Sequence, residues 1–191
     1  MNDIHFDDQV ALVTGAGGGM GREYAIALAR RGARVVVNDY GGSVGGEPGT
    51  AARAEAVAAE IEALGGVAVA SGEAVGTFEA ARAIVDRAVD GFGRLDIIVN
   101  NAGIARAGSM DKLDFGWVEA VYRTDLIGAH ALIAAAWPVM KRQGHGRILN
   151  VSSNAALGIG GNAAYSAAKA GMIGLTLDAA REGASLGIHV N

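Results

Sequence analysis

The sequence predicts an α/β fold in which helices cover both faces of one doubly wound, parallel sheet. Short, continuously apolar segments alternate with longer amphipathic segments along the 191 residues, and glycines stand where the two kinds of segment meet. Parallel strands that are covered on both faces need such continuous apolar segments, whereas a strand with one face in water would alternate. The length suits a single domain with a sizeable core.

Each expected element follows from these local signals. The apolar segments predict strands at residues 10–14, 34–38, 67–70, 95–100 and 148–152, and a further strand that begins at Ile188. The amphipathic segments predict helices at residues 21–31, 50–64, 78–92, 114–142 and 162–186. Gly32, Gly65 and Gly187 follow three of these helix ends, where a left-handed cap is expected. The alternation of strand and helix implies right-handed crossovers.

The composition excludes several classes of function. Apolar residues make up 51% of the chain, and 30 glycines accompany only 2 prolines, which favours a compact protein over a disordered one. The net charge of −4 comes from scattered residues of both signs, so no basic stripe indicates nucleic-acid binding. There is no cysteine, and the 4 histidines lie far apart, so we expect no metal site.

No segment indicates secretion or a membrane span. The acidic residues Asp3, Asp7 and Asp8 stand where a signal peptide would carry basic residues followed by an apolar stretch. The longest apolar segment, residues 131–140, is too short to cross a bilayer and contains Pro138. We therefore expect a soluble, cytoplasmic protein with no membrane partner.

A glycine-rich turn joins the first strand to the first helix. Residues 14–21 read Thr-Gly-Ala-Gly-Gly-Gly-Met-Gly, so that Gly15 opens the turn and Gly19 and Gly21 stand where the helix begins. Glycines let the backbone approach a pyrophosphate, and a helix N-terminus offers unpaired N–H groups and a partial positive charge. In this context the turn predicts a dinucleotide site on a Rossmann-type fold. The alternative is a tight strand–helix joint without a ligand.

Asp39 ends the second strand, and its position favours NAD as the cofactor. An acid about 20 residues after the glycines can accept hydrogen bonds from the adenosine ribose and repels a 2′-phosphate. Position 18, inside the turn, is Gly, so no basic side chain there can hold such a phosphate. Both features favour NAD over NADP. The alternative for Asp39 is an exposed acid in a turn.

Small and amide residues follow the fourth strand. The segment reads Asn100, Asn101, Ala102, Gly103. Ligands of doubly wound sheets lie at the carboxyl ends of the strands, and small residues there leave room for a nicotinamide ribose. An ordinary turn rich in asparagine is the alternative reading of this segment.

Two serines, Ser152 and Ser153, end the fifth strand, and Tyr165 and Lys169 follow on a helix. Residues four apart share one face of a helix. A free tyrosine has a pKa of about 10, and a nearby ammonium favours its ionised form. The pair can therefore act as a base near neutral pH, while a serine hydroxyl holds the substrate oxygen. A solvated helix face is the alternative.

Together these motifs resemble the short-chain dehydrogenase/reductase family over residues 6–191. The resemblance implies an NAD(P)-dependent enzyme and a homo-oligomer, dimer or tetramer, built from the long helices. It implies Tyr165 as general acid or base, and Lys169 as a ligand of the nicotinamide ribose that lowers the tyrosine pKa. The implied cofactor-binding residues are Gly15, Gly19, Met20, Gly21, Asp39, Ala74, Val75, Asn101, Ala102 and Gly103, together with Tyr165 and Lys169.

Residues 37–42, the glycine-rich segment 41–49 behind them and residues 148–171 resemble one branch more closely. This branch is the hydroxyacyl-CoA dehydrogenase domain of peroxisomal multifunctional β-oxidation enzymes. It implies NAD and a small-molecule substrate, namely a secondary alcohol or ketone of the 3-hydroxyacyl thioester or hydroxysteroid class. The segment 41–49 itself either covers the cofactor or is a surface loop.

The sequence departs from the family pattern at three places. Asp125 stands where the family has an Asn whose backbone carbonyl supports a water, so we expect Asp125→Asn to keep kcat within about tenfold of the wild-type value.

The position of the catalytic serine is the second departure. Counting from Gly146 selects Ser153, whereas counting back from Tyr165 selects Ser152. We predict Ser153, because loop length changes more easily than strand register. The sequence stops at Asn191, so we expect the domain, residues 1–191, to lack a C-terminal strand and the substrate lid.

Three functions fit these features. The leading one is an NAD-dependent oxidoreductase that transfers a hydride between a secondary alcohol and NAD. The second is an NAD-binding module without catalysis, and the third is an epimerase or dehydratase that retains NAD. Tyr165 and Lys169 favour the first, since a module without catalysis needs neither.

Overall fold

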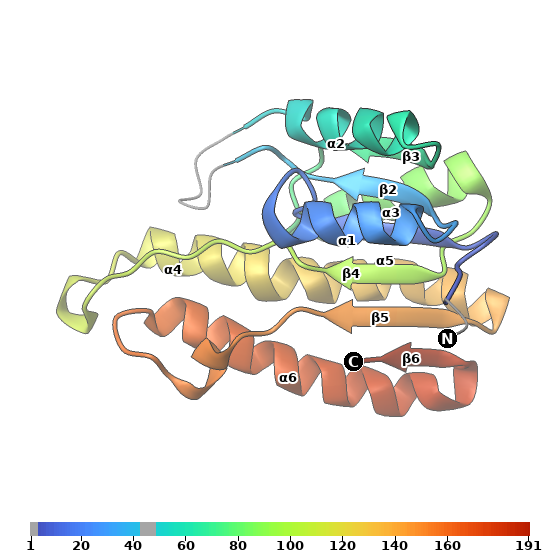
Figure 1. Ribbon diagram of the computed structural model, residues 1–191. Helices are drawn as coiled ribbons and strands as arrows, with labels where there is room; N and C mark the ends of the chain where they lie inside the picture. Colours follow the sequence, from blue (N-terminus) through green and yellow to red (C-terminus); the bar gives the residue numbers. More distant parts are fainter. Residues whose placement is uncertain (1–3, 43–48) are drawn as a thin grey trace.

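The computed structural model describes residues 4–42 and 49–191, and shows a parallel sheet between two layers of helices (Figure 1). The sheet has six strands in the order β3-β2-β1-β4-β5-β6, and all its neighbouring strands are parallel. The strands are β1 (Val10–Thr14), β2 (Arg34–Asn38), β3 (Val67–Ser71), β4 (Ile97–Asn100), β5 (Gly146–Asn150) and β6 (Ile188–Val190). The strand order reverses between β1 and β4, which is where doubly wound sheets bind ligands.

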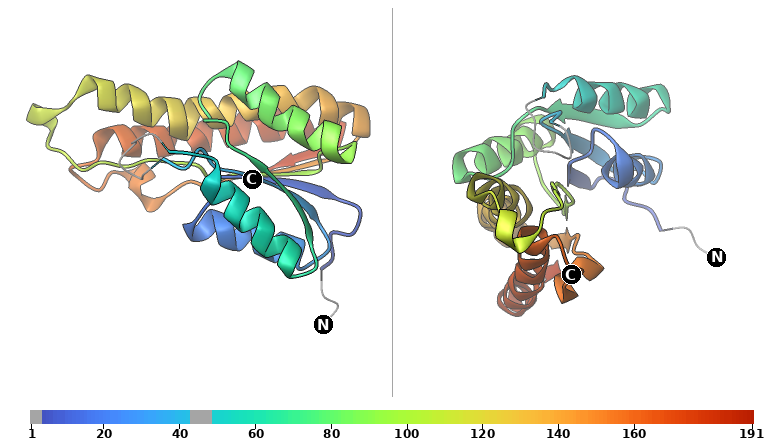
Figure 2. Two further views of the ribbon diagram at one scale, coloured as in Figure 1. Left: turned by 90° about the horizontal axis from the view of Figure 1, so that it is seen from above. Right: turned by 90° about the vertical axis from the view of Figure 1, so that its left-hand side faces the viewer.

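The helices divide between the two faces, as the right-hand view of Figure 2 shows. One face carries α1 (Gly19–Ala29) and α2 (Ala52–Ala63); the other carries α3 (Phe78–Phe92), α4 (Phe115–Tyr122), α5 (Gly128–Gln143) and α6 (Ala163–Gly183). Leu12 of β1 packs into the core beneath α3 and α5, whereas its neighbour Val13 packs against α1 and α2. Both side chains are fully buried, which confirms why the strand is continuously apolar.

The strands and helices agree with the sequence prediction except at several boundaries. β1, β2 and α3 have the predicted bounds, and Gly32, Gly65 and Gly187 have the left-handed φ values of +94°, +85° and +74° that were expected of caps. The predicted bounds of the fifth strand were wrong, because β5 ends at Asn150 and leaves both serines outside the ladder.

The long helix predicted at residues 114–142 is interrupted. It divides into α4, a π-helical turn over Arg123–Ile127, and α5. The interruption lies at the predicted site residue Asp125. Six of the residues in the glycine-rich segment 41–49, residues 43–48, lie outside the described residues, so the two readings of that segment stay predictions.

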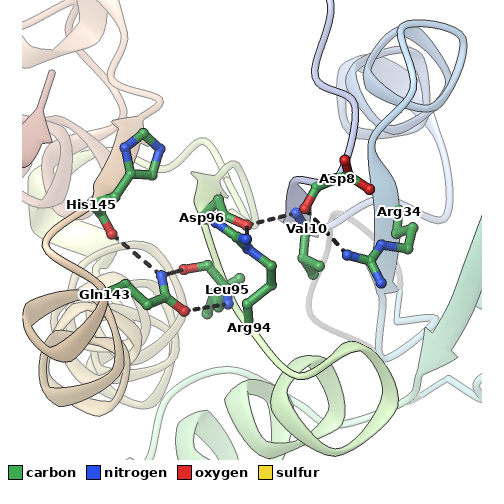
Figure 3. Close-up of polar contacts among 8 residues, drawn as sticks. All are labelled: Asp8, Val10, Arg34, Arg94, Leu95, Asp96, Gln143 and His145. Atoms are coloured by element: carbon green, nitrogen blue, oxygen red, sulfur yellow. Dashed lines mark hydrogen bonds and ion pairs between the residues drawn. The ribbon is translucent and has the colours of Figure 1, made fainter.

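A polar cluster joins β1 to β4 at the amino ends of these strands, away from the glycine turn at the carboxyl end of β1 (Figure 3). Asp96 is fully buried and accepts hydrogen bonds from the Val10 amide at 2.9 Å and from both Nε and Nη2 of Arg94 at 2.8 Å. Gln143 pairs with the backbone of Leu95, donating to its carbonyl at 2.8 Å and accepting from its amide at 3.1 Å. These bonds satisfy polar groups at the amino ends of the strands, where burial would otherwise be costly.

Candidate active site

The glycine turn packs tightly against the segment after β4. Gly15 has a φ of +62°, and a Cβ on it would lie 2.9 Å from Ala102 Cα. A Cβ on Gly21 would lie 2.2 Å from the Gly15 carbonyl oxygen, so side chains at either position would force the turn apart. Gly18, the N-cap residue of α1, gives no side-chain hydrogen bond to the first turn, and a Cβ on Gly19 would meet no atom within 4 Å. The helix N-terminus is therefore open to a pyrophosphate.

Thr14 and Asn101 fasten this turn to β4. Thr14 Oγ1 accepts hydrogen bonds from the amides of Asn101 at 3.1 Å and Ala102 at 3.0 Å. The Asn101 side chain donates to the carbonyls of Thr14 at 2.9 Å and Gly15 at 3.2 Å. The Asn101 side chain thus links the glycine turn to the segment after β4 by hydrogen bonds, and Ala102 and Gly103 follow it directly.

Asp39 lies beside the glycine turn, as expected, but its carboxylate already has two partners. Oδ2 accepts from the Gly17 amide at 2.8 Å and Oδ1 accepts from the Gly41 amide at 2.6 Å. A Cβ on Gly17 would lie 2.8 Å from Asp39 Cγ and 2.6 Å from Arg53 Cβ. Arg53, an exposed residue of α2, is a neighbour that the sequence reasoning missed, since nothing local connects it to position 39.

The predicted adenine side is built from the end of β3. Asn38 is buried and donates to the carbonyls of Ser71 at 3.2 Å and Glu73 at 2.9 Å, which fixes the chain just before Ala74 and Val75. A Cβ on Gly128 would lie 3.0 Å from Val75 Cβ, so Val75 packs on the start of α5. Met20, by contrast, is 61% exposed at the start of α1.

Tyr165 and Lys169 share one face of α6. The Lys169 ammonium lies 5.4 Å from the centroid of the Tyr165 ring. Only 3% of Lys169 is exposed, and its Nζ donates to the Val151 carbonyl at 3.1 Å. The tyrosine itself is partly buried and packs against a small apolar cluster of Val121, Ala164 and Ala168.

Asp125 is the second charged group of this site. Its Oδ2 lies 3.3 Å from Lys169 Nζ, and its Oδ1 accepts from the Ile104 amide at 2.8 Å. Burial raises the pKa of the Asp125 carboxyl, while the Lys169 ammonium and the Ile104 amide oppose that rise. Gly103 has to be small here, because a Cβ on it would lie 2.7 Å from Asp125 Oδ2.

The two serines point to different partners. Ser152 Oγ donates to the backbone carbonyl of Lys169 at 2.9 Å and so fastens the strand end to α6. Ser153 Oγ accepts from the Ala155 amide at 3.2 Å and caps a short 3-10 helix over Asn154–Leu157. The hydroxyl of Ser152 is therefore committed to the backbone, while that of Ser153 has only contacts within its own loop.

A sequence profile described as "short chain dehydrogenase" matches residues 9–191. The chain belongs to the short-chain dehydrogenase family. A relative from Saccharomyces cerevisiae, "Peroxisomal hydratase-dehydrogenase-epimerase", is 45% identical over 190 residues, which cover 99% of this chain and 21% of the relative. A relative from Synechocystis, "3-oxoacyl-[acyl-carrier-protein] reductase", is 42% identical over 184 residues, which cover 96% of this chain and 71% of the relative.

A solved structure has the same fold. The crystal structure of a short chain dehydrogenase from Mycobacterium avium superposes with a TM-score of 0.89 at 43% identity, covering 97% of this chain and 66% of that one. The short-chain dehydrogenase family generally uses NAD or NADP, and the open helix N-terminus with its two crowded glycines fits such a dinucleotide. The chain spans about a fifth of the length of the Saccharomyces cerevisiae relative.

Within residues 4–42 and 49–191, no group of three acidic or histidine side chains is placed to hold a metal ion. Among the same residues, no helix is both long enough and apolar enough to cross a membrane.

Proposed function

We propose that this chain is an NAD-dependent oxidoreductase that transfers a hydride between a secondary alcohol and NAD, with Tyr165 as the general acid or base. The observation that carries the proposal is the buried Lys169 ammonium, 5.4 Å from the Tyr165 ring. A positive charge that is shielded from water favours the phenolate over the phenol, which is the form that can take a proton.

Each group has a separate task in alcohol oxidation. NAD, when bound, would supply the acceptor for the hydride of the carbinol carbon. Tyr165 takes the proton of the substrate hydroxyl, so that the carbon–oxygen single bond becomes the double bond of a ketone as the hydride leaves. Lys169 holds the nicotinamide ribose and keeps the phenolate stable, and Ser153 donates a hydrogen bond to the substrate oxygen. Well-placed acid–base catalysis contributes on the order of a hundred- to ten-thousand-fold.

The dinucleotide would lie across the carboxyl ends of β1, β2 and β4. The turn from Gly15 to Gly21, with Met20, would hold the pyrophosphate, Asp39 the adenosine ribose, and Ala74 and Val75 the adenine. The nicotinamide side would be lined by Asn101, Ala102 and Gly103. Asp39 supports NAD rather than NADP, because its carboxylate stands where a 2′-phosphate would go, and its bond to Gly17 fixes it there.

The proposed substrate class is a 3-hydroxyacyl thioester or a hydroxysteroid-like alcohol. The name of the Synechocystis relative, "3-oxoacyl-[acyl-carrier-protein] reductase", supports an acyl substrate oxygenated at carbon 3, and the word "dehydrogenase" in the name of the Saccharomyces cerevisiae relative supports the reaction type. We also propose a homo-oligomer, dimer or tetramer, formed through the long helices. Ile173 and Leu177, one turn apart on α6, are 45% and 53% exposed and would be covered by a second copy. The proposed location is the cytoplasm; a fluorescent fusion of the full-length protein in peroxisomes would contradict it.

The decisive experiment is NADH formation with a panel of 3-hydroxyacyl-CoA esters, hydroxysteroids and simple secondary alcohols. The wild-type protein should reduce NAD with at least one of them, and Tyr165→Phe should lower kcat by at least about a hundredfold. Tyr122→Phe, which removes the hydroxyl of a tyrosine 36% exposed on α4, serves as the control and should leave kcat unchanged.

Two other results would favour the alternative functions. If NAD binds but no alcohol is oxidised, the chain is a binding module without catalysis. If NAD stays bound through gel filtration and turnover leaves no net NADH, an epimerase or dehydratase is the better assignment. Either result contradicts the proposed reaction.

A further inference from the structure

Asp125 and Lys169 form a buried ion pair beside the proposed base. Asp125 is 1% exposed and Lys169 is 3% exposed, so water screens neither charge. The ammonium forms an ion pair with Asp125 Oδ2 at 3.3 Å and donates a hydrogen bond to the carbonyl of Val151, the residue after β5, at 3.1 Å. A lysine side chain with four rotatable carbons is thus held in one place.

The local backbone is arranged around the carboxylate. Asp125 lies in the π-helical turn between α4 and α5, and π turns inside helices occur frequently at functional sites. The Ile104 amide donates to Oδ1 at 2.8 Å, which fixes the carboxylate on the side away from the lysine. Gly103 gives it room, since a Cβ there would lie 2.7 Å from Oδ2 and 3.4 Å from Lys169 Nζ.

Among the described residues, Asp125 is the one carboxylate within 4.0 Å of Lys169. The other nearby charges face elsewhere. Arg106, in the segment after β4, lies over Trp117, with its Cζ 5.7 Å from the ring centroid. The Arg123 side chain lies beside Gly76, since a Cβ on that glycine would be 2.7 Å from Arg123 Cγ. Both arginines are exposed and screened by water, as is His130 on α5.

We propose that Asp125 is a positioning residue whose carboxylate, and not only its backbone, acts on the reaction through Lys169. The carboxylate holds the ammonium and offsets part of its charge, so the positive field that reaches the Tyr165 ring, 5.4 Å away, is weaker than it would be beside an unpaired lysine. The inference rests on the proposed function, because it assigns Tyr165 the role of base. Asp125 thus contributes a negative charge at a position where the family pattern has a neutral amide.

In Asp125→Asn the side chain keeps its size and its bond to the Ile104 amide but loses its charge. The Lys169 ammonium then acts on Tyr165 without compensation, which favours the phenolate. The acid limb of the kcat/KM profile for alcohol oxidation should move to lower pH by roughly one unit. The maximal kcat should stay within about tenfold of wild type.

Two controls separate this effect from damage to the fold. Glu119→Gln removes an exposed carboxylate from α4 and should leave the pH profile in place. Asp125→Glu keeps the charge and should restore a profile close to that of wild type, even if kcat falls. An acid limb that stays in place in Asp125→Asn, or that moves to higher pH, would overturn the proposal.

A second measurement does not depend on turnover. Ionisation of Tyr165 can be followed by the ultraviolet absorbance of the phenolate in protein without cofactor, as the difference between each variant and the same variant carrying Tyr165→Phe. The midpoint should fall in Asp125→Asn relative to wild type, and an unchanged midpoint contradicts the proposal. Absence of any alcohol oxidation together with a shifted midpoint would refute the proposed function while leaving the effect of Asp125 on Tyr165 in place.

Discussion

The Gly17 amide donates a hydrogen bond to Asp39 Oδ2 at 2.8 Å, so the acid at the end of β2 supports the glycine turn before any ribose is bound. The same carboxylate accepts from the Gly41 amide at 2.6 Å. Asp39 therefore has two roles that sequence reasoning did not separate. It orders the backbone on both sides of the proposed adenosine site, and in the proposed function it would repel the 2′-phosphate of NADP.

Substitution of Asp39 separates these roles. Asp39→Ala should relax the preference for NAD over NADP, measured as the ratio of kcat/KM values for the two cofactors. Asp39→Asn keeps a hydrogen-bond acceptor for the Gly17 amide but removes the charge, so it should shift the ratio in the same direction with less loss of NAD affinity. Arg53, beside Gly17, would favour NADP once the acid is gone. An unchanged ratio in both variants would refute the charge role.

The two serines give the second prediction. Ser153→Ala should lower kcat by on the order of a hundredfold, because it removes the proposed donor to the substrate oxygen. Ser152→Ala removes the bond from Ser152 to the Lys169 carbonyl and should cost about 1 kcal/mol of unfolding free energy. Its kcat should remain near that of wild type. Steady-state kinetics combined with urea unfolding of both variants would show the reverse pattern if Ser152 were the catalytic residue.

The fold was predictable because its signals are local. The continuous apolar segment of β1 predicts a strand that is buried on both faces. Gly32, Gly65 and Gly187 predict the positive φ values that end three helical segments. Both signals can be read within a few neighbouring residues. The interruption at Asp125 was not predictable in this way. Residues 123–127 carry neither Gly nor Pro, so no local signal marks the π turn between α4 and α5.

The candidate site was predicted in part for the same reason. Tyr165 and Lys169 were placed together by helical spacing alone, which needs no tertiary information. The carbonyl of Val151, the amide of Ile104 and the stem of Arg53 come from distant segments, so only the folded structure shows them beside the predicted residues. The bounds of the fifth strand were also misjudged, because β5 covers Gly146–Asn150 and not residues 148–152.

The third prediction concerns the fit of α1 against the glycine turn. Gly21→Ala would place a Cβ 2.2 Å from the Gly15 carbonyl oxygen and 2.6 Å from Asn101 Nδ2. Both are held by hydrogen bonds, so the helix must move, at a cost of about 1–3 kcal/mol. Gly91→Ala on α3 is the control, because its Cβ meets no atom within 4 Å and it should stabilise the protein by up to about 1 kcal/mol. Equal unfolding free energies for the two variants would contradict this account.

The last prediction is that titration of His145 makes the free energy of unfolding depend on pH. Burial lowers the pKa of His145 below its ordinary value of 6.5, and Arg147 acts in the same direction, while Asp96 opposes them. Between the lowered pKa and 6.5 the unfolded chain binds more protons than the folded one, so the free energy of unfolding rises with pH. The contribution of His145 to the free energy of unfolding is therefore complete above pH 6.5, and it is lost as the pH falls through the pKa that His145 has in the folded protein.

His145→Asn should flatten this part of the stability curve. Urea unfolding at a series of pH values from about 5 to 8 would measure it, with the difference between wild type and variant growing as the pH rises through the window. His130→Asn, on the exposed side of α5, is the matched control and should keep the wild-type slope. Because His145 is only half-buried, the change in slope should be small, and a steeper slope in His145→Asn than in wild type would show that the histidine is stabilised in its charged form instead.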